Sequence, residues 1–356
     1  MSMEKKISII PYQHERKLFI IAFVISVIAW GSVLILTKGM ILAIIPFVFL
    51  GYLIAQSGFV SYLKGSGALV STKQFPDIQE SVESCAACIG LKTVPNVYVL
   101  HMDGMFNAFA LRFLHKQYVV LLSDIVDAMD KKPDALRFYI GHEMAHLYRK
   151  HTLWETFLTP ALVLPLLGAA YSRSREYTCD AYGAACCELP ESSRLGLAAL
   201  AVGGTKYTVL NGEAYMDQLK DTKGFWMSFH ELIGNYPWLI KRFARVGNKT
   251  ETKIPNRNPA AYLLAVFVPR LSIMSAVVIY LVFIGITAMG AMKEFGHQGK
   301  SDTEYSSGYD DQENQAEEEY IAGEIYEGDL GKFYQFLGGD PYAESSWKEV
   351  PPPEAK

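Results

Sequence analysis

Three long apolar segments without a charged residue limit what this chain can fold into more than any other feature. They cover residues 18–36, 40–60 and 271–292. Each is close to the roughly 20 residues that a helix needs to cross a bilayer. Half of the chain is hydrophobic and 20% is charged, whereas about 25% is usual in soluble domains. The sequence therefore predicts an integral membrane protein and excludes a purely soluble or a disordered chain.

The charges are divided unevenly along the chain. Residues 301–356 contain 15 acidic residues and three lysines, a charge of −12, although the whole chain carries only −4. The remaining body therefore carries +8. Its positive charge lies beside the apolar segments, where anionic lipid is the natural partner, so nucleic acid is not an expected ligand.

The first two apolar segments predict a membrane hairpin. A short Thr-Lys-Gly turn joins them, and no small-residue cleavage site follows the first, which argues against a signal peptide. Basic residues flank both outer ends of the hairpin, so the N-terminus and the following domain are predicted to be cytoplasmic. Many basic residues precede the third segment and few follow it, which places the acidic tail on the opposite side.

This pattern divides the chain into an N-terminal segment with the hairpin, a catalytic-sized domain, a membrane region with the last span, and an acidic tail expected to be disordered. The respective ranges are 1–63, 64–258, 259–292 and 293–356. Within the domain, residues 157–170 are apolar but contain two prolines and are too short to span. We expect them to form a re-entrant or interfacial piece.

The domain is predicted to be mainly α-helical with a small β-sheet. Amphipathic spacing predicts helices over 79–91 and from 135 to about 151. Runs of β-branched and aromatic residues predict strands at 96–100 and 118–122. The five cysteines are an odd number, which favours buried thiols in a reducing compartment. Cys85 and Cys88 are spaced as a redox or zinc pair, but no second pair of matching spacing follows.

The pentapeptide from His142 to His146 reads His-Glu-Met-Ala-His. Two histidines four residues apart lie on one helix face, where both rings can bind one Zn²⁺. Glu143 lies beside them, placed to take a proton from a water activated by the metal. The other six histidines, His151 among them, show no ligand spacing and are expected to be surface or packed residues.

A catalytic zinc needs a third protein ligand and one open position. The candidate is Glu176, four residues before Asp180 on one helix face. Asp180 can then accept a hydrogen bond from the outer nitrogen of a ligand histidine. The alternative, without a metal, is a solvated helix in which Glu176 and Asp180 pair with Arg173 and Arg175. Cys179 is a rival ligand, but its offset from Glu176 turns it to another part of the helix.

Taken together, these motifs resemble the membrane zinc metallopeptidases of the family containing the HtpX heat-shock protease and the CAAX prenyl endopeptidases. The resemblance covers about residues 64–246. The matching features follow in the family's order: the membrane hairpin, Val94-Pro95-Asn96-Val97-Tyr98-Val99, Asn107-Ala108-Phe109-Ala110, the HExxH helix, the segment from Ser172-Arg173 through Glu176 to Asp180, and Tyr236-Pro237-Trp238-Leu239-Ile240-Lys241-Arg242.

The resemblance implies an integral-membrane, zincin-like metallopeptidase with one Zn²⁺ per chain. It implies that His142, His146 and Glu176 bind the metal, that Glu143 is the general base and that Asp180 orients a ligand. Asn107, Ala108 and Phe109 would form an edge on which an extended substrate pairs. Protein or peptide substrates, unfolded proteins or membrane proteins, would be hydrolysed in HtpX-like quality control.

Two departures from the family pattern affect what can be transferred. Tyr236 occupies the place of a family histidine, with Arg242 at the expected distance. A phenol can donate to a developing oxyanion, so Tyr236 or Arg242 is expected to stabilise it in catalysis. Packing of Tyr236 beside its neighbours is the alternative. Only 29 residues separate His146 from Glu176, whereas HtpX-type proteins place two membrane helices there. This puts the family's membrane access route in doubt.

Two other classes of function remain open. Antibiotic-sensing signal transducers combine membrane helices with HExxH and a downstream Glu-x-x-x-Asp at a similarly short spacing. They carry a long extracytoplasmic sensor after the last span, where this chain has only its acidic tail. A non-proteolytic scaffold that uses the tail for docking is the third class. Zinc content would separate it from the other two.

Overall fold

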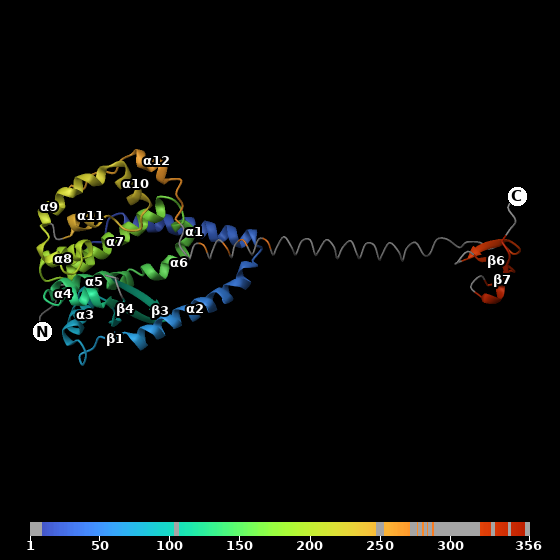
Figure 1. The fold of residues 1–356 in the computed structure, drawn as a ribbon, viewed down its shortest axis with the longest axis horizontal. Coiled ribbons are helices and arrows are strands. Elements are labelled where there is room, and N and C mark those ends of the chain that lie inside the picture. Colours follow the sequence, from blue (N-terminus) through green and yellow to red (C-terminus); the bar gives the residue numbers. More distant parts are fainter. Residues whose placement is uncertain are drawn as a thin grey trace. The chain divides into compact units, whose positions relative to one another are not determined.

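The computed structural model describes most of the N-terminal part of the chain and three stretches of the C-terminal part (Figure 1). The described residues are 9–102, 107–246, 253–270, the single helical positions 276, 280, 283 and 287, and 321–328, 332–340 and 343–352. The chain divides into two units, Met1–Thr287 and Ala288–Lys356. Apart from those four positions, the predicted span at 271–292 lies outside the described residues.

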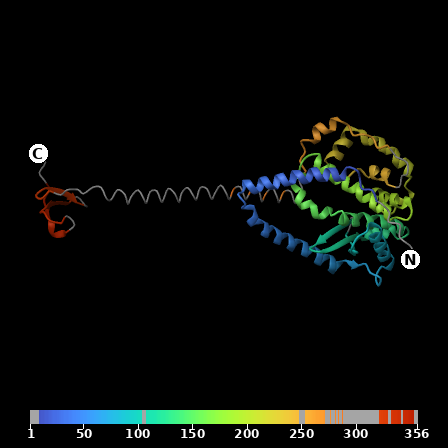
Figure 2. The same ribbon diagram turned by 180° about the vertical axis from the view of Figure 1, so that it is seen from behind.

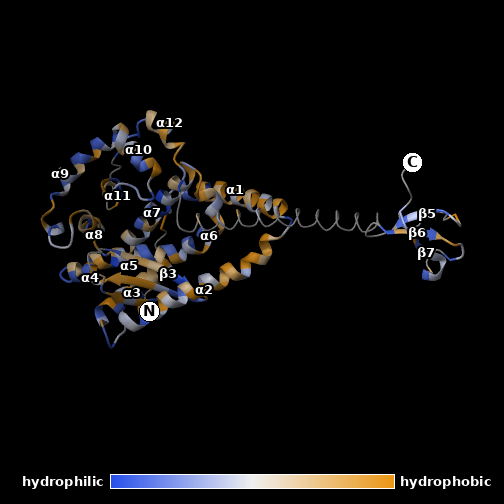
Figure 3. Ribbon diagram, turned by 45° about the vertical axis from the view of Figure 1, so that its right-hand side comes forward, coloured by the Kyte–Doolittle hydropathy of each residue, from blue (hydrophilic) through white to orange (hydrophobic). Residues whose placement is uncertain are grey.

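The predicted hairpin is a pair of apolar helices, α1 (Glu15–Leu36) and α2 (Ile41–Ser66). Both are long and apolar enough to cross a membrane by length and composition. None of the most apolar stretch of α2 is buried, so α2 is not the core helix of a soluble fold. Figure 3 shows the apolar residues along both helices. The elements are confirmed, and their passage through a bilayer stays a prediction.

The first unit contains a four-stranded sheet in the order β1-β2-β4-β3. Strand β1 (Ala68–Leu69) is antiparallel to β2 (Asn96–Leu100), β2 is parallel to β4 (Lys116–Leu122), and β3 (Ala108–Phe113) is antiparallel to β4. The two predicted strands are therefore present. Strand β3 lies at the edge of the described sheet, with one side free of a partner strand.

Alternation along β4 divides the core between two layers, because successive side chains of a strand point to opposite faces. Val119 and Leu121 belong to the main core with helices α3 (Pro76–Ile89), α4 (Ser123–Met129) and α5 (Pro133–Tyr148). Val120 and Leu122 pack with Leu63 at the end of α2. The sheet is thus covered by the helical core on one face and by α2 on the other.

Helix α6 (His151–Leu162) and helix α7 (Leu167–Cys186) follow α5. Figures 1 and 2 both show α1 running beside α6 and α7. Leu158 of α6 is fully buried in a cluster with Ala22 of α1, and Trp30 Nε1 donates to the Phe157 carbonyl at 2.8 Å. The apolar segment 157–170 therefore packs along α1. Whether it enters a bilayer stays a prediction.

Two glycines let α5 and α7 approach closely. A Cβ added at Gly141 would lie 2.6 Å from Cys186 Sγ, and one at Gly183 would lie 2.5 Å from the Phe138 carbonyl oxygen. Any side chain at either position would force the helices apart. This contact brings the downstream carboxylates of α7 to the histidines of α5.

The rest of the first unit is built from short helices. They are α8 (Pro190–Val202), the 3₁₀ turns η1 (Tyr207–Val209) and η2 (Gln218–Lys223), α9 (Gly212–Asp217), α10 (Phe225–Ile233), α11 (Leu239–Arg245) and α12 (Ala260–Ala265). Buried Glu231 in α10 pairs with Lys241 at 2.6 Å and with Arg257 at 2.9 Å. These pairs fix α11 and the loop that carries Tyr236.

The second unit contains a three-stranded antiparallel sheet in the order β5-β6-β7. Its strands are β5 (Ile325–Gly328), β6 (Lys332–Phe336) and β7 (Trp347–Val350), with a 3₁₀ turn at Glu344–Ser346. In these residues the structure differs from the predicted disorder. The rings of Phe336 and Tyr326 pack on Trp347, with centroids 4.8 and 5.6 Å away. The acidic composition of the tail gave no sign of this aromatic cluster.

Candidate metal centre and active site

The two histidines of the HExxH motif and Glu176 meet between α5 and α7. Nε2 of His142 lies 3.4 Å from Glu176 Oε2, and Nε2 of His146 lies 3.7 Å from Glu176 Oε1. Both histidines lie one turn apart on α5, as their spacing predicts, and Glu176 is 7% exposed. One carboxylate therefore faces two imidazole nitrogens.

These separations fit a zinc ion. Two donors held about 2.1 Å from one ion at the corners of a tetrahedron are about 3.4 Å apart. The distances from Glu176 to His142 and His146 are 3.4 and 3.7 Å. Two imidazoles and one carboxylate are also a ligand set of catalytic zinc sites that keeps a fourth position open. Each histidine nitrogen thus lies at a suitable distance from a Glu176 oxygen for a shared ion, although the two contacts use different oxygens of the carboxylate.

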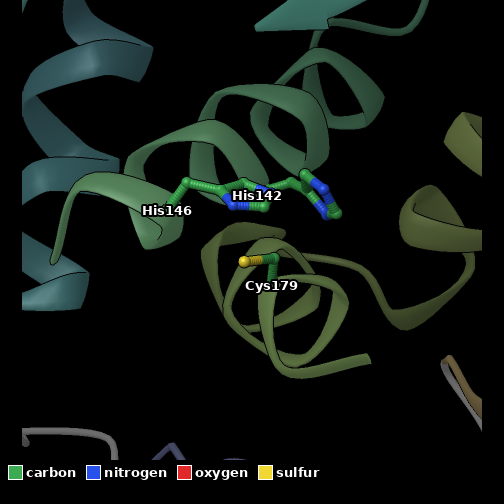
Figure 4. A group of neighbouring side chains, drawn as sticks. All are labelled: His142, His146 and Cys179. Carbon is green, nitrogen blue, oxygen red and sulfur yellow. The ribbon is translucent and has the colours of Figure 1, made fainter. Parts of the chain in front are cut away.

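Cys179 offers a second possible third ligand. Ligand atoms of His142, His146 and Cys179 lie within 4.8 Å of one another, and Figure 4 shows Cys179 on α7 facing the histidines of α5. Its Sγ lies 3.7 Å from His151 Nδ1. Cys179 does not line the cleft described below, whereas Glu176 does. The geometry favours Glu176 as the ligand on the substrate side.

Asp180 lies at the outer side of His142, with Oδ1 3.0 Å from His142 Nδ1. Arg242 holds the same carboxylate through two hydrogen bonds, from Nε at 2.8 Å and from Nη2 at 2.6 Å. Burial opposes ionisation of Asp180, but Arg242 and His142 lower its pKa. Asp180 therefore stays a carboxylate and can orient His142. Arg242 thereby anchors Asp180, and its Nη1 lies 3.6 Å from Glu176 Oε2.

The pKa of Glu143 suits a general base. Burial raises the pKa of Glu143 to about 7, while the charges of His142 and Arg242 and a hydrogen bond from the Ala110 backbone act in the opposite direction. A general base works best when its pKa lies near the working pH. Glu143 can thus accept a proton near neutral pH and release it again.

A cleft of about 230 Å³ opens over the histidines. It is lined by nine of the ten residues that sequence reasoning assigned to the site, all but Asp180. One wall is formed by Asn107 and by Ala108 and Phe109 at the start of edge strand β3, and Tyr236 lies on another. The negative charge of Glu176 raises the pKa of Tyr236, which is 63% exposed. Its phenol is therefore protonated at neutral pH and available as a donor.

Sequence reasoning missed two buried residues at this site, His151 and Glu15. The Nδ1 atoms of His146 and His151 are 3.2 Å apart, and His151 Nε2 lies 3.1 Å from Glu15 Oε1. His151 was expected to be a surface or packed histidine. The only sequence signal was its position five residues after His146, which does not match a helix face.

We expect zinc binding to depend on pH through His142. Burial disfavours its cation, but Asp180 and Glu176 more than offset this and raise the pKa of His142 to about 10 in the metal-free chain. A metal needs the Nε2 lone pair, so it must displace this proton, and affinity rises with pH below 10. The apparent zinc affinity should rise about tenfold per pH unit between pH 6 and 8. Competition with a chelating dye measures it, and a flat profile would contradict this ionisation.

The paired histidines and the carboxylate beside them are a donor set that suits a metallopeptidase. Comparison with protein families agrees, because the model of peptidase family M48 matches residues 72–170. This is the family of HtpX and the CAAX-protease-like zinc metallopeptidases, so the resemblance drawn from the motifs is confirmed. The match ends before Glu176, whose role rests on the geometry. Neither the curated proteins nor the solved structures gave a match.

Proposed function

We propose that this chain is a membrane-anchored, zinc-dependent endopeptidase that hydrolyses unfolded or membrane proteins, in the manner of HtpX-like quality control. The observation that carries the proposal is the position of Glu176, whose two oxygens face the Nε2 atoms of His142 and His146. Glu143 lines the same cleft, next to an edge strand. This combination supplies a metal site, a general base and an edge strand on which a substrate can pair.

The chain's own residues would divide the chemistry among them. A bound Zn²⁺ supplies a Lewis acid that polarises the scissile carbonyl and acidifies water. His142, His146 and Glu176 hold it, and Asp180 orients His142. Glu143 takes the proton of the attacking water at a carboxylate oxygen and passes it to the leaving amine nitrogen. Tyr236 Oη donates a hydrogen bond to the carbonyl oxygen as negative charge develops there.

Edge strand β3 would bind the substrate as an added strand. An unpaired strand edge presents backbone donors and acceptors that an extended peptide can match. Ala108, Phe109 and Ala110 of this strand line the cleft. Because backbone pairing reads few side chains, the substrate would be an unfolded or extended segment rather than one fixed sequence.

The membrane arrangement follows from the charges of the sequence. Helices α1 and α2 would cross the bilayer as a hairpin, with the catalytic domain on the cytoplasmic side. The span at 271–292 would carry the C-terminal unit to the opposite side. The enzyme would thus be a multi-pass protein whose active site meets cytoplasmic or membrane-embedded substrates.

A signal transducer is the second candidate, and the three-stranded sheet of residues 325–350 favours it over a chain with a disordered tail. Such a transducer would cleave its target only after a ligand binds outside. The proposed endopeptidase would cleave reduced casein with no added ligand, measured on the purified full chain in detergent. No cleavage of casein by a zinc-loaded chain would contradict the proposed function.

Replacement of Tyr236 by phenylalanine tests the proposed donor. Loss of one oxyanion donor costs about 100-fold in kcat with little change in KM, and zinc content should stay the same. The Tyr62→Phe variant, on exposed α2, is the matched control and should retain wild-type rates of casein cleavage. An unchanged kcat in Tyr236→Phe would assign Tyr236 to packing.

A further inference from the structure

The outer nitrogen of His146 begins a chain of contacts that ends on the first helix of the protein. Its Nδ1 lies 3.2 Å from Nδ1 of His151, and Nε2 of His151 lies 3.1 Å from Oε1 of Glu15. Glu15 is the first residue of α1, more than 130 positions before His146 in the sequence. His151 is 2% exposed and Glu15 is 3% exposed. The contacts therefore run through the interior.

Besides His151, two other side chains hold Glu15. Arg149, after the end of α5, donates to Oε1 at 3.0 Å, and Thr178 of α7 donates to Oε2. The Tyr12 backbone N–H in turn donates to the Thr178 hydroxyl at 3.0 Å. A buried carboxylate is costly unless such partners satisfy it. Glu15 is thus a buried carboxylate whose two oxygens are both held by hydrogen-bond partners.

With His151 neutral, the contacts fit one arrangement of protons. A carboxylate only accepts hydrogen bonds, so His151 Nε2 carries the proton that Glu15 binds. A neutral His151 then has its lone pair on Nδ1, where it accepts the N–H of His146 Nδ1. The thiol of Cys179 lies 3.7 Å from the same Nδ1 and can donate only weakly to its lone pair. His146 is left with its own lone pair on Nε2, the atom that faces Glu176.

We propose that Glu15 is a positioning residue for the metal ligand His146, acting through His151. The proposal rests on the proposed function, because it requires that His146 binds zinc. It gives the two ligand histidines parallel supports: Asp180 contacts His142 directly, while Glu15 reaches His146 through a second imidazole. It also makes the N-terminal apolar helix part of the metal centre, because α1, the proposed membrane helix, carries the Glu15 carboxylate at its first residue.

Zinc affinity of the purified full chain in detergent, measured by competition with a chelating dye, tests this proposal. Loss of an outer partner of a ligand histidine weakens metal binding about 10- to 100-fold. We expect this loss in Glu15→Ala and in His151→Ala. The double variant should lose no more than either single variant, because both break one chain. Losses that multiply would indicate two independent structural effects and would overturn the proposal.

Arg149→Gln is the matched control, because Arg149 contacts Glu15 but lies outside the path to His146. Its zinc affinity should stay within about threefold of wild type. An equal loss in Arg149→Gln would mean that docking of α1, not the imidazole chain, supports the site. Where Glu15→Ala does not fold, Glu15→Gln decides: it keeps an acceptor without the charge, and a loss on the order of 3- to 10-fold is expected. Unchanged affinity would overturn the proposal.

The absorption spectrum of the Co²⁺-loaded chain gives a second readout that general destabilisation does not imitate. The visible bands should shift in Glu15→Ala and His151→Ala and stay in place in Arg149→Gln. Complete loss of metal from His151→Ala, with Glu15→Ala unaffected, would make His151 a ligand and overturn its role as a relay. A wild-type chain that binds no zinc would instead contradict the proposed function itself.

Discussion

The Glu143→Gln variant is expected to keep one zinc per chain and to lose casein cleavage by on the order of 10³-fold in kcat. Glutamine has the shape of glutamate and can still accept from the Ala110 backbone, so the cleft should remain intact. It cannot take a proton near neutral pH, which is the role that the pKa of about 7 gives Glu143. Zinc analysis and single-substrate kinetics on the same preparation measure both effects.

The matched control for this variant is Glu191→Gln, an exposed residue at the start of α8. It removes the same charge outside the cleft and should leave kcat unchanged. Casein cleavage by Glu143→Gln at more than a tenth of the wild-type rate would show that another group removes the proton. Loss of zinc in this variant would instead make Glu143 part of the metal centre.

The second large effect is expected for the third ligand. Glu176→Ala should weaken zinc binding by about 10³-fold, because one of three ligands carries about a third of a binding free energy near 12 kcal/mol. Cys179→Ser should change the affinity by less than about threefold, since the sulfur lies on the His151 side of the site. Dye competition on both variants decides between the ligands. Zinc loss in Cys179→Ser with retention in Glu176→Ala would reverse the assignment.

The local part of this site could be predicted from sequence because helix geometry fixes it. His142 and His146 share a face at a spacing of four, as do Glu176 and Asp180. The HExxH helix was expected to continue to about His151, but α5 ends at Tyr148. Lys150 adopts a left-handed φ of 60°, and this turn swings His151 back toward His146. The end of the helix contains no glycine, proline, asparagine or aspartate that would have marked it in the sequence.

Tertiary contacts explain what sequence reasoning could not supply. No sequence pattern singled out Glu15, because its partners lie in α6, in α7 and just after α5. The glycine contact that brings α7 onto α5 is equally invisible in the spacing of motifs. In the tail, acidic composition outweighed the aromatic residues that pair across β6 and β7. An average composition cannot show which few residues of a segment pack together.

Removal and return of zinc test the central claim most directly. The purified full chain in detergent is stripped with a chelator, and casein cleavage is followed as zinc is added back. We predict no cleavage by the metal-free chain and a return of activity that is complete at one zinc per chain. Cleavage that persists without metal, or zinc-loaded chains that remain inactive, would contradict it.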